Sequence, residues 1–393
     1  MIQAVYLKKG KDESLKRHHS WVFSGALAYM DEGIKEGDTV RVISAEGELL
    51  GVGHFQLGTI AVRMLAFEDT EINDEFWFDR LKKALAMRKA AGIAMNDDGN
   101  TFRLVHGEGD QLPGLVVDCY GVTAVIQAHS VGMHEARMAI CNALLRLEDL
   151  HIENIFYKSE TTLPYKAGVE SENGFLVGGH ADDVAVENNL KFHIDWLRGQ
   201  KTGFFVDQRD NRLLLEKYSK GKRVLNMFCY TGGFSVYALR GGAELVHSVD
   251  SSEKAVDLTR QNVELNFPND ERHQAYCEDA FRFLEKTTGE YDLIVLDPPA
   301  FAKHRHALHN ALKGYTRLNA KGIEKVKPGG IIFTFSCSQA VSKEQFQAAV
   351  FTAALRAHRN VGILHQLHQP ADHPISIYHP EGEYLKGLVL YVE

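Results

Sequence analysis

The chain has 393 residues, too many for one hydrophobic core, and its 45% hydrophobic and 24% charged residues are ordinary for a globular protein. The net charge of −8 excludes indiscriminate nucleic-acid binding but leaves room for a local basic surface. No apolar run approaches the roughly 18 residues of a membrane span, and we expect no signal peptide. The five cysteines are scattered without a CxxC pair, so we expect no disulfides, no metal and a cytoplasmic location.

The first half of the chain divides into two predicted domains. Residues 1–70 hold short alternating apolar runs broken by glycine, a pattern that predicts a small β-barrel. Residues 71–195 predict an α+β domain, in which a helix over 73–92 is followed by strands and a second helix. Asn73 can cap that first helix and Gly92 can end it. Its apolar face is predicted to be Phe76, Leu81, Leu85 and Met87.

Residues 196–393 change to a pattern of compact apolar runs separated by helical stretches. The runs are "KRVLNMF", "ELVHSVD", "YDLIVLD" and "GGIIFTFS", and the helices include residues 252–266 and 342–358. This alternation predicts an α/β fold with a doubly wound, mostly parallel sheet. The closing run "YLKGLVLYVE" is predicted to be an antiparallel edge strand.

Ligands of such sheets bind beyond the carboxyl ends of the strands. The first strand is followed by "CYTGGFSVYA", where Gly232 and Gly233 let the backbone approach a ligand. The second strand ends in Asp250, which suits ribose hydroxyls, and Asp279 after the third could meet an adenine amino group. The GxGxxG fingerprint of dinucleotide sites is absent. The ordered series of a glycine loop, Asp250, Asp279 and Asp297 resembles the class I S-adenosylmethionine (SAM) methyltransferases.

The fourth and fifth strands supply the candidate reacting groups. The fourth ends in "LDPPAF", where two prolines hold Asp297 at the sheet edge beside Phe301, a pairing that could grip a flat base. The fifth ends in "FSCSQ" and delivers Cys337 to the same edge. A thiolate that adds to C6 of cytosine makes C5 nucleophilic enough to accept a methyl group. Methylation of an exocyclic amine needs no cysteine, so Cys337 discriminates between two reactions.

Longer motifs then carry a family resemblance. The stretches "RHHSWVFSGAL", "LPGLVVDCYG", "GQKTGFFVDQRDNR", "LIVLDPPAFAK" and "HPEGEYLKGLVL" resemble the bacterial 23S ribosomal RNA cytosine-C5 methyltransferases with an N-terminal PUA domain. The resemblance implies a PUA-type barrel, a middle domain and a Rossmann-like SAM domain, with 23S ribosomal RNA as the partner. It also implies that Gln208 and Arg209 lie near SAM. The base that removes the C5 proton stays unassigned, with Asp297 or a water that it holds as the hypothesis.

The predicted site residues follow from these motifs. The catalytic residues are Cys337 and Asp297. The SAM-binding set is Gln208, Arg209, Phe228, Tyr230, Thr231, Gly232, Gly233, Asp250, Asp279, Ala280 and Asp297.

Two basic clusters are predicted to contact RNA. Residues 8–19 hold five Lys or Arg against two acids, and residues 303–327 hold seven against one. Their predicted RNA-binding residues are Lys16, Arg17, Lys303 and Arg305, together with Phe301. The sequence leaves open an RNA or DNA amino-methyltransferase, and also a non-catalytic RNA-binding factor in ribosome assembly. It also leaves open whether the protein is a homodimer.

Overall fold

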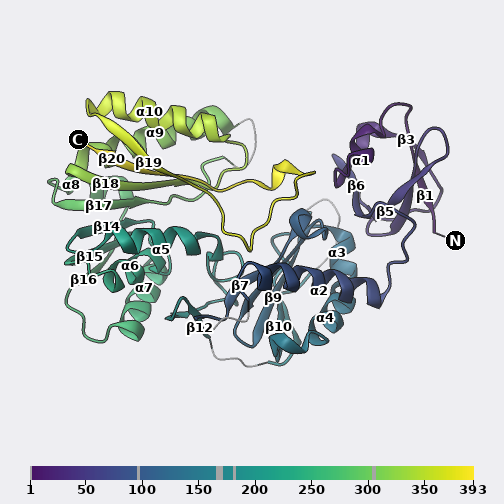
Figure 1. Ribbon diagram of the computed structural model, residues 1–393, viewed down its shortest axis with the longest axis horizontal. Helices are drawn as coiled ribbons and strands as arrows, with labels where there is room; N and C mark the ends of the chain where they lie inside the picture. The colour runs from purple at the N-terminus through teal and green to yellow at the C-terminus, as the bar shows by residue number, and fades with distance from the viewer. Residues whose placement is uncertain (1, 95–97, 165–170, 180–182, 303–306) are drawn as a thin grey trace. The chain divides into compact units, whose positions relative to one another are not determined.

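The computed structural model describes residues 2–94, 98–164, 171–179, 183–302 and 307–393 (Figure 1). The chain forms two compact units. The first consists of Met1–Asn189, Ile194–Val206 and Ala371–Gly382, and the second of Leu190–His193, Asp207–Pro370 and Glu383–Glu393. We call Ala371–Gly382 the return segment, because the chain there rejoins the first unit before it completes the second. The predicted boundaries after residues 70 and 195 stay a prediction.

The first unit begins with a β domain made from the alternating apolar runs. Its strands form one sheet in the order β2-β6-β5-β4-β1-β3. Alternation turns every second side chain inward, so that Val5, Val40 and Val62 are fully buried in one core. The β fold predicted for this region is confirmed. Its elements are β1 (Ala4–Leu7), α1 (Glu13–Lys16), β2 (Trp21–Phe23), β3 (Leu27–Met30), β4 (Thr39–Ile43), β5 (Leu49–Phe55) and β6 (Ile60–Ala66).

The remainder of the first unit is an α+β fold around a second sheet, in the order β11-β10-β9-β8-β7. Strand β10 runs parallel to β9, and the other neighbouring pairs are antiparallel. Its elements are α2 (Asp74–Ala90), β7 (Thr101–His106), β8 (Leu115–Tyr120), β9 (Thr123–Ala128), α3 (Val131–Glu135), α4 (Arg137–Leu145), β10 (Asn154–Tyr157), β11 (Gly174–Val177) and β12 (Val184–Glu187).

Helix α2 starts where the sequence predicted, because the Asn73 side chain accepts a hydrogen bond of 3.0 Å from the Phe76 N–H. Leu81 and Leu85 are buried as predicted, but Met87 is 43% exposed. The predicted inner face was therefore wrong at that position.

Arg88, one residue further on, is fully buried instead. Its guanidinium forms an ion pair with the equally buried Asp110 and donates to the carbonyl oxygens of Arg103 and Asp372 at 2.9 and 2.8 Å. A buried charge is tolerated where its partners are this complete, so the apolar pattern alone could not find this position.

The second unit is built on a seven-stranded sheet in the order β16-β15-β14-β17-β18-β20-β19. The first five strands of that order are parallel, as predicted, and Figure 1 shows α9 and α10 on one face and α5, α6 and α7 on the other. Its elements are β13 (Leu190–His193), α5 (Arg209–Tyr218), β14 (Arg223–Met227), α6 (Gly233–Arg240), β15 (Leu245–Asp250), α7 (Glu253–Asn266), β16 (His273–Cys277), α8 (Ala280–Lys286), β17 (Tyr291–Leu296), α9 (Leu308–Lys325), β18 (Val326–Ser336), α10 (Lys343–Ala357), β19 (Val361–Leu367) and β20 (Lys386–Val392).

The closing strand departs from its predicted place. Strand β20 is antiparallel to its neighbours, as expected, but it lies between β18 and β19 rather than at the edge. The outermost strand is β19, which the sequence analysis did not identify. Strand β20 is the more buried of the two, and its run "GLVL" is buried at each position.

Among the helices that the structure describes, none combines the length and the apolar character that crossing a membrane requires.

Candidate active site

The strand order gathers the predicted groups at one edge of the sheet in the second unit. Strands β15, β14, β17 and β18 are parallel neighbours, so their carboxyl ends share that edge. Asp250 ends β15, the glycine loop follows β14, Asp297 follows β17, and Cys337 follows β18. The structure thus brings together residues that are far apart in the sequence.

The glycine loop between β14 and α6 has an unusual backbone. Phe228, Tyr230 and Gly232 have φ angles of 60°, 47° and 76°, in the left-handed region that most residues avoid. A Cβ added to Gly232 would lie 2.6 Å from Cγ2 of Thr259, so only glycine fits there. The loop passes its backbone close to neighbouring groups, as a cofactor-binding turn must.

Asp250 holds this loop in place. Its Oδ2 accepts a hydrogen bond of 3.1 Å from the Tyr230 N–H, and its Oδ1 accepts one of 3.0 Å from the Ser252 N–H. A carboxylate oxygen has two lone pairs, so each keeps one for a ligand hydroxyl.

Asp279 has a structural task of its own. It is the N-cap of α8, and its Oδ1 accepts from the Arg282 N–H at 3.0 Å. Asp279 is exposed and the following Ala280 is buried. Contact of either residue with an adenine ring stays a prediction.

A chain of amide groups positions Asp297. The Gln208 side chain donates to Asp297 Oδ2 at 3.0 Å, and Asn211 donates to Gln208 Oε1 at 2.6 Å. Gln208, Arg209 and Asn211 are each at most 6% exposed. The sequence placed Gln208 and Arg209 near the cofactor only through the family resemblance. The contact with Asp297 gives Gln208 a physical reason to be at this edge.

Cys337 lies in a half-buried position in the loop after β18. The Ser338 hydroxyl beside it accepts a 3.3 Å hydrogen bond from the Ala302 N–H and shares one of 2.9 Å with the Tyr315 hydroxyl. The ring of Phe301 packs on Tyr315, with centroids 4.7 Å apart. These contacts join the cysteine loop to the loop that contains Asp297.

The other four cysteines are poor nucleophiles in this structure. Burial raises the pKa of Cys119 and Cys141, and raises that of Cys229 to about 12. Cys277 is exposed, but a hydrogen bond to Glu253 raises its pKa. Burial and neighbouring acids therefore hold these four as thiols.

Lys386 is a site residue that the sequence analysis missed. It pairs with Ser336 across strands β20 and β18, and its Nζ donates to the Ser338 carbonyl oxygen at 2.7 Å. The side chain is only 4% exposed, and burial lowers its pKa to about 8, while Cys337 acts to raise it. The available signal was a lysine inside the apolar run "YLKGLVL".

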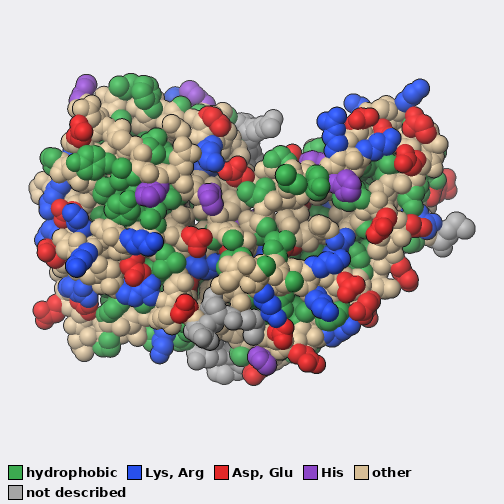
Figure 2. Space-filling model, in the orientation of Figure 1, with side chains coloured by type: hydrophobic (Ala, Val, Ile, Leu, Met, Phe, Trp, Pro, Cys, Tyr) green, Lys and Arg blue, Asp and Glu red, His purple; other side chains and the backbone are tan. Residues whose placement is uncertain are grey.

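The predicted RNA-binding residues are only partly described. Lys303 and Arg305 lie outside the described residues. Lys16 pairs with Asp12 at 2.7 Å, and Arg17 lies 3.9 Å from Glu13, both on the exposed side of α1. Figure 2 shows Lys and Arg mixed with Asp and Glu over the visible face rather than gathered in one patch.

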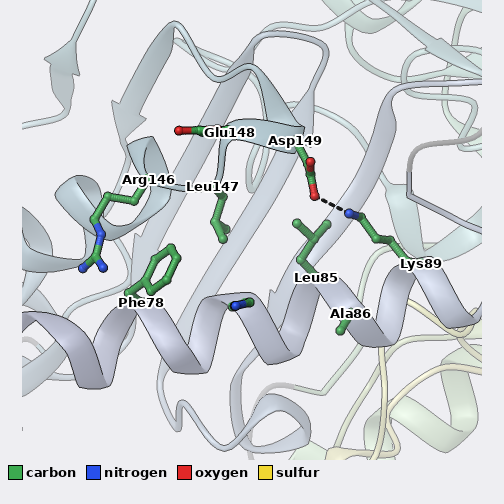
Figure 3. Close-up of a pocket in the computed structure, with 9 residues that line it drawn as sticks. Phe78, Leu85, Ala86, Lys89, Arg146, Leu147, Glu148 and Asp149 are labelled. Carbon is green, nitrogen blue, oxygen red and sulfur yellow. Dashed lines mark hydrogen bonds and ion pairs between the residues drawn. The ribbon is translucent and has the colours of Figure 1, made fainter.

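A groove in the first unit offers a competing location for a site. It lies between α2 and residues 146–149 (Figure 3). Two of its cations and one acid already have partners, because Lys89 pairs with Asp149, and Arg146 covers the ring of Phe78 at 3.9 Å. None of its nine lining residues is a histidine, cysteine, serine or threonine, so the groove offers no thiol, hydroxyl or imidazole group.

The doubly wound sheet, the left-handed glycine turn and the acidic strand ends define a Rossmann-like methyltransferase fold. A sequence model described as S-adenosylmethionine-dependent methyltransferase matches residues 162–376, and a PUA-like domain model matches residues 5–67. The chain therefore belongs to the S-adenosylmethionine-dependent methyltransferases, and SAM is its cofactor. The geometry fits SAM, since the left-handed backbone of the glycine loop lies beside Asp250, whose carboxylate oxygens keep lone pairs for a ligand.

Full-length relatives match the chain from end to end. The chain is 40% identical to the ribosomal RNA large subunit methyltransferase I of Alteromonas mediterranea, over 100% of this chain and 99% of the relative. It is 39% identical to the protein of that name from Photobacterium profundum, over 100% of both. Among solved structures, a methyltransferase complexed with SAH has a TM-score of 0.85 at 23% identity, and a SAM-dependent methyltransferase from Streptococcus mutans has 0.84 at 22%, each over 100% of both chains.

Proposed function

We propose that this protein methylates C5 of a cytosine in 23S ribosomal RNA, with Cys337 as the nucleophile. The observation that carries the proposal is Cys337 itself. It is half-buried, follows the strand beside Asp297, and has the buried Lys386 amino group on the adjacent strand. The ribosomal substrate is supported by relatives named ribosomal RNA large subunit methyltransferase I. A ribosomal substrate also supports a cytoplasmic location.

The chemistry requires four events at the base. The Cys337 thiolate adds to C6, which makes C5 nucleophilic. SAM supplies the electrophilic methyl group, which C5 accepts. A base then removes the proton from C5, and the C6–S bond breaks to release 5-methylcytosine and the thiolate. We propose Asp297, or a water that it holds, as that base.

Lys386 has a defined role in this scheme. A nearby ammonium favours a thiolate over a thiol, because opposite charges in a buried setting stabilise each other. Its hydrogen bond to the Ser338 carbonyl holds the amino group beside the cysteine loop. We propose that Lys386 keeps Cys337 ionised and is a positioning residue rather than a group that touches the base.

The RNA contacts are proposed to come from two places. Phe301, with its ring on Tyr315, lies in the loop after Asp297 and could stack on a base that has left its helix. Lys303 and Arg305 follow directly in sequence, and Lys16 and Arg17 belong to the PUA-like domain. We propose that these four cations pair with RNA phosphates.

Amino-methylation remains the second candidate, because Asp297 and the two prolines after it would also suit an exocyclic amine. Nucleoside mass spectrometry on ribosomal RNA from a deletion strain decides between the two. We expect one 5-methylcytidine to be lost and to return with the wild-type gene but not with Cys337→Ala. Loss of an N-methylated nucleoside, rescued equally by Cys337→Ala, would establish the amine reaction. A full set of methylated nucleosides in the deletion strain would favour the non-catalytic assembly factor.

A further inference from the structure

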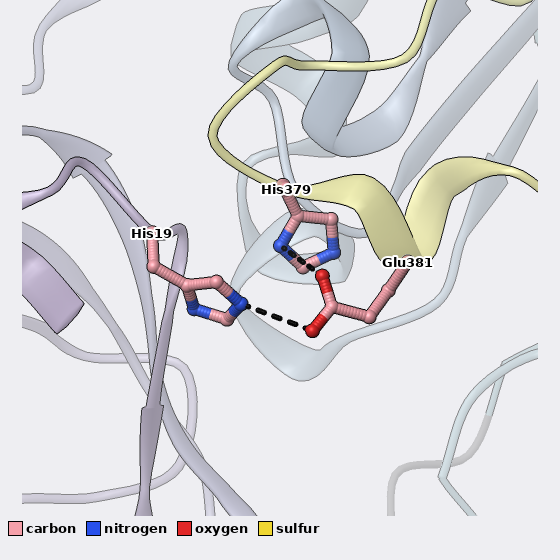
Figure 4. A group of neighbouring side chains, drawn as sticks. All are labelled: His19, His379 and Glu381. Atoms are coloured by element: carbon pink, nitrogen blue, oxygen red, sulfur yellow. Dashed lines mark hydrogen bonds and ion pairs between the residues drawn. The ribbon is translucent and has the colours of Figure 1, made fainter.

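Three metal-ligating side chains converge in the first unit, outside the proposed active site. His19 lies just before β2, and His379 and Glu381 lie in the return segment (Figure 4). His19 Nε2 is 3.3 Å from Glu381 Oε1, and His379 Nδ1 is 3.6 Å from Glu381 Oε2. One ligand atom from each residue can be chosen so that all three lie within 4.8 Å of one another.

These spacings are close to those around a bound ion. With Zn–N and Zn–O bonds of about 2.0–2.1 Å, two ligand atoms of a tetrahedral zinc lie roughly 3.3–3.4 Å apart. The two contacts to Glu381, at 3.3 and 3.6 Å, already approach that separation. These contacts use different oxygens of Glu381, and with one ligand atom from each residue the three atoms lie within 4.8 Å, so binding requires a small adjustment of the side chains.

His379 supplies an independent sign that points to a ligand. Its side chain is only 2% exposed, and its Nδ1, which Figure 4 shows facing the Glu381 carboxylate, has no hydrogen-bond partner among the described residues. Buried polar atoms without a partner are rare, and a bound ion is one recognised explanation. The ring is held there by the edge-on Trp21, whose Nε1 donates to Glu108 at 2.8 Å.

His19 has the outer contact that a metal-bound histidine needs. Its Nδ1 lies 3.3 Å from the Trp21 carbonyl oxygen and 3.2 Å from the Trp21 N–H. In the tautomer that donates to the carbonyl oxygen, Nε2 is unprotonated and can bind an ion. Ligating histidines almost always donate their second nitrogen to a carbonyl or carboxylate in this way.

We propose that His19, His379 and Glu381 bind one divalent transition-metal ion of the zinc type. Two imidazoles and a carboxylate suit zinc rather than magnesium or calcium. Water completes the coordination from the exposed side of Glu381, whose side chain is 48% accessible. The ion joins the N-terminal β domain to the return segment, and it is independent of the methylation proposed above. The sequence motifs could not predict it, because His19 and Glu381 are 362 positions apart.

The test is a titration of the full-length, chelator-treated protein without an affinity tag. Zn²⁺ is titrated by calorimetry, and Co²⁺ by its visible absorption, which becomes intense in tetrahedral coordination. We expect one ion per chain. His379→Ala should abolish the Co²⁺ spectrum, and Glu381→Gln should weaken Zn²⁺ binding by at least tenfold to a hundredfold, the effect of losing even an outer contact. The control is His18→Ala, an exposed neighbour that stacks on Phe67 and should leave binding intact.

Glu381→Gln keeps the test decisive if His379→Ala fails to fold, because Glu381 is half exposed and the change is isosteric. The proposal is overturned if the wild-type protein binds no Zn²⁺ or Co²⁺. It is equally overturned if Glu381→Gln binds as tightly as the wild type, or if His18→Ala weakens binding as much. In those cases the three side chains are neighbouring polar groups that bind no ion.

Discussion

Lys386 is the first residue of β20, and burial of its amino group lowers its pKa to about 8. Below that pH the group is an ammonium and supports the proposed Cys337 thiolate. Above it the support is lost, so the methylation rate should fall as the pH rises through about 8. In Lys386→Arg the side chain stays charged, so the fall in rate should move to higher pH. In Lys386→Met kcat should be lower, and the rate should no longer fall near pH 8.

The pH–rate profiles of the three proteins provide the measurement. Lys327→Met is the control, because that lysine pairs with Asp292 at 3.0 Å near the opposite end of β18 and should leave the profile unchanged. If the rate still falls at alkaline pH in Lys386→Met, the titrating group is not Lys386.

The lowered pKa of Lys386 also predicts how the free energy of unfolding depends on pH. Since an unfolded lysine titrates near 10.5, the stability should rise as the pH increases from about 8 toward 10.5.

The Cys337 thiolate should also be trapped on its substrate. In RNA with 5-fluorocytidine at the target position, the fluorine cannot leave as a proton does, so elimination of the cysteine stalls after methyl transfer. We expect a denaturation-resistant protein–RNA adduct that forms only with SAM and is absent in Cys337→Ser. Denaturing gel electrophoresis detects it.

The control for trapping is Cys277→Ser, which removes the exposed cysteine. That variant should trap at the wild-type rate, and both variants should bind SAM normally. Trapping that survives Cys337→Ser would assign the nucleophile to another residue, whereas a wild-type protein that forms no adduct would favour the amine reaction.

At the scale of elements, the turn from β14 into α6 is where backbone conformation and cofactor binding meet. Gly232→Ala adds a Cβ at a φ of 76° and at 2.6 Å from Thr259. Strain of about 1–3 kcal/mol should pull the loop away from its native path. SAM affinity by calorimetry should then fall roughly tenfold to a hundredfold.

Gly242, at the other end of α6, is a matched control. Its φ is 85°, but an added Cβ would have no heavy atom closer than 3.8 Å. Gly242→Ala should therefore lower the melting temperature through backbone strain while SAM affinity stays the same. An equal fall of SAM affinity in both variants would mean that α6 as a whole, and not the loop, governs the cofactor.

Helices and strands were predictable from the sequence where neighbouring residues alone determine where they start and end. Asn73 caps α2 and Ser252 caps α7 by side-chain hydrogen bonds that such residues make at any helix start. Four of the five parallel strands of the second unit are apolar runs of the right length, and β16, "HQAYC", is the exception. The order of these strands brings Asp250, Asp297 and Cys337 to one edge. That much of the candidate site followed from the alternation of strands and helices.

What escaped prediction depends on partners far away in the chain. Arg88 is buried because Asp110 and the Asp372 carbonyl receive its charge. Lys386 is buried because the Ser338 carbonyl faces it from another strand. Strand β19 begins with the short apolar run "VGIL", but Ile363 and Leu364 are 42% and 45% exposed, so its burial does not follow the run. A hydrophobicity pattern predicts that charged side chains lie on the surface. That prediction is wrong where groups from distant parts of the chain pair with the charge and allow it to be buried.

At the scale of the whole molecule, a chain of net charge −8 needs local cations if it is to bind the proposed RNA substrate, which is a polyanion. Reversal of Lys303 and Arg305 to Glu should weaken RNA binding and leave SAM binding intact. The slope of log affinity against log salt should flatten by about 0.7 for each phosphate of single-stranded RNA that the protein no longer neutralises. Filter binding across a salt series measures it.

An equal change of net charge at another place is the control. Lys82→Glu with Lys83→Glu alters exposed residues of α2 and should leave the slope nearly unchanged. If both double variants flatten the slope equally, the effect is a general one of net charge, and Lys303 and Arg305 do not contact phosphate.

The return segment determines when the first unit can finish folding during translation. Arg88 and the Arg103 N–H find partners on Asp372, so the first unit is complete only when that residue has been synthesised. At 5–20 residues per second, translation takes roughly ten to thirty seconds to pass from Val206 to Ala371. During that interval a nearly finished N-terminal half waits outside the ribosome, and Arg88 and the Arg103 N–H still lack their contacts with Asp372. Strand β20 follows the return segment closely, so the first unit and the sheet of the second unit are completed within a short stretch of chain.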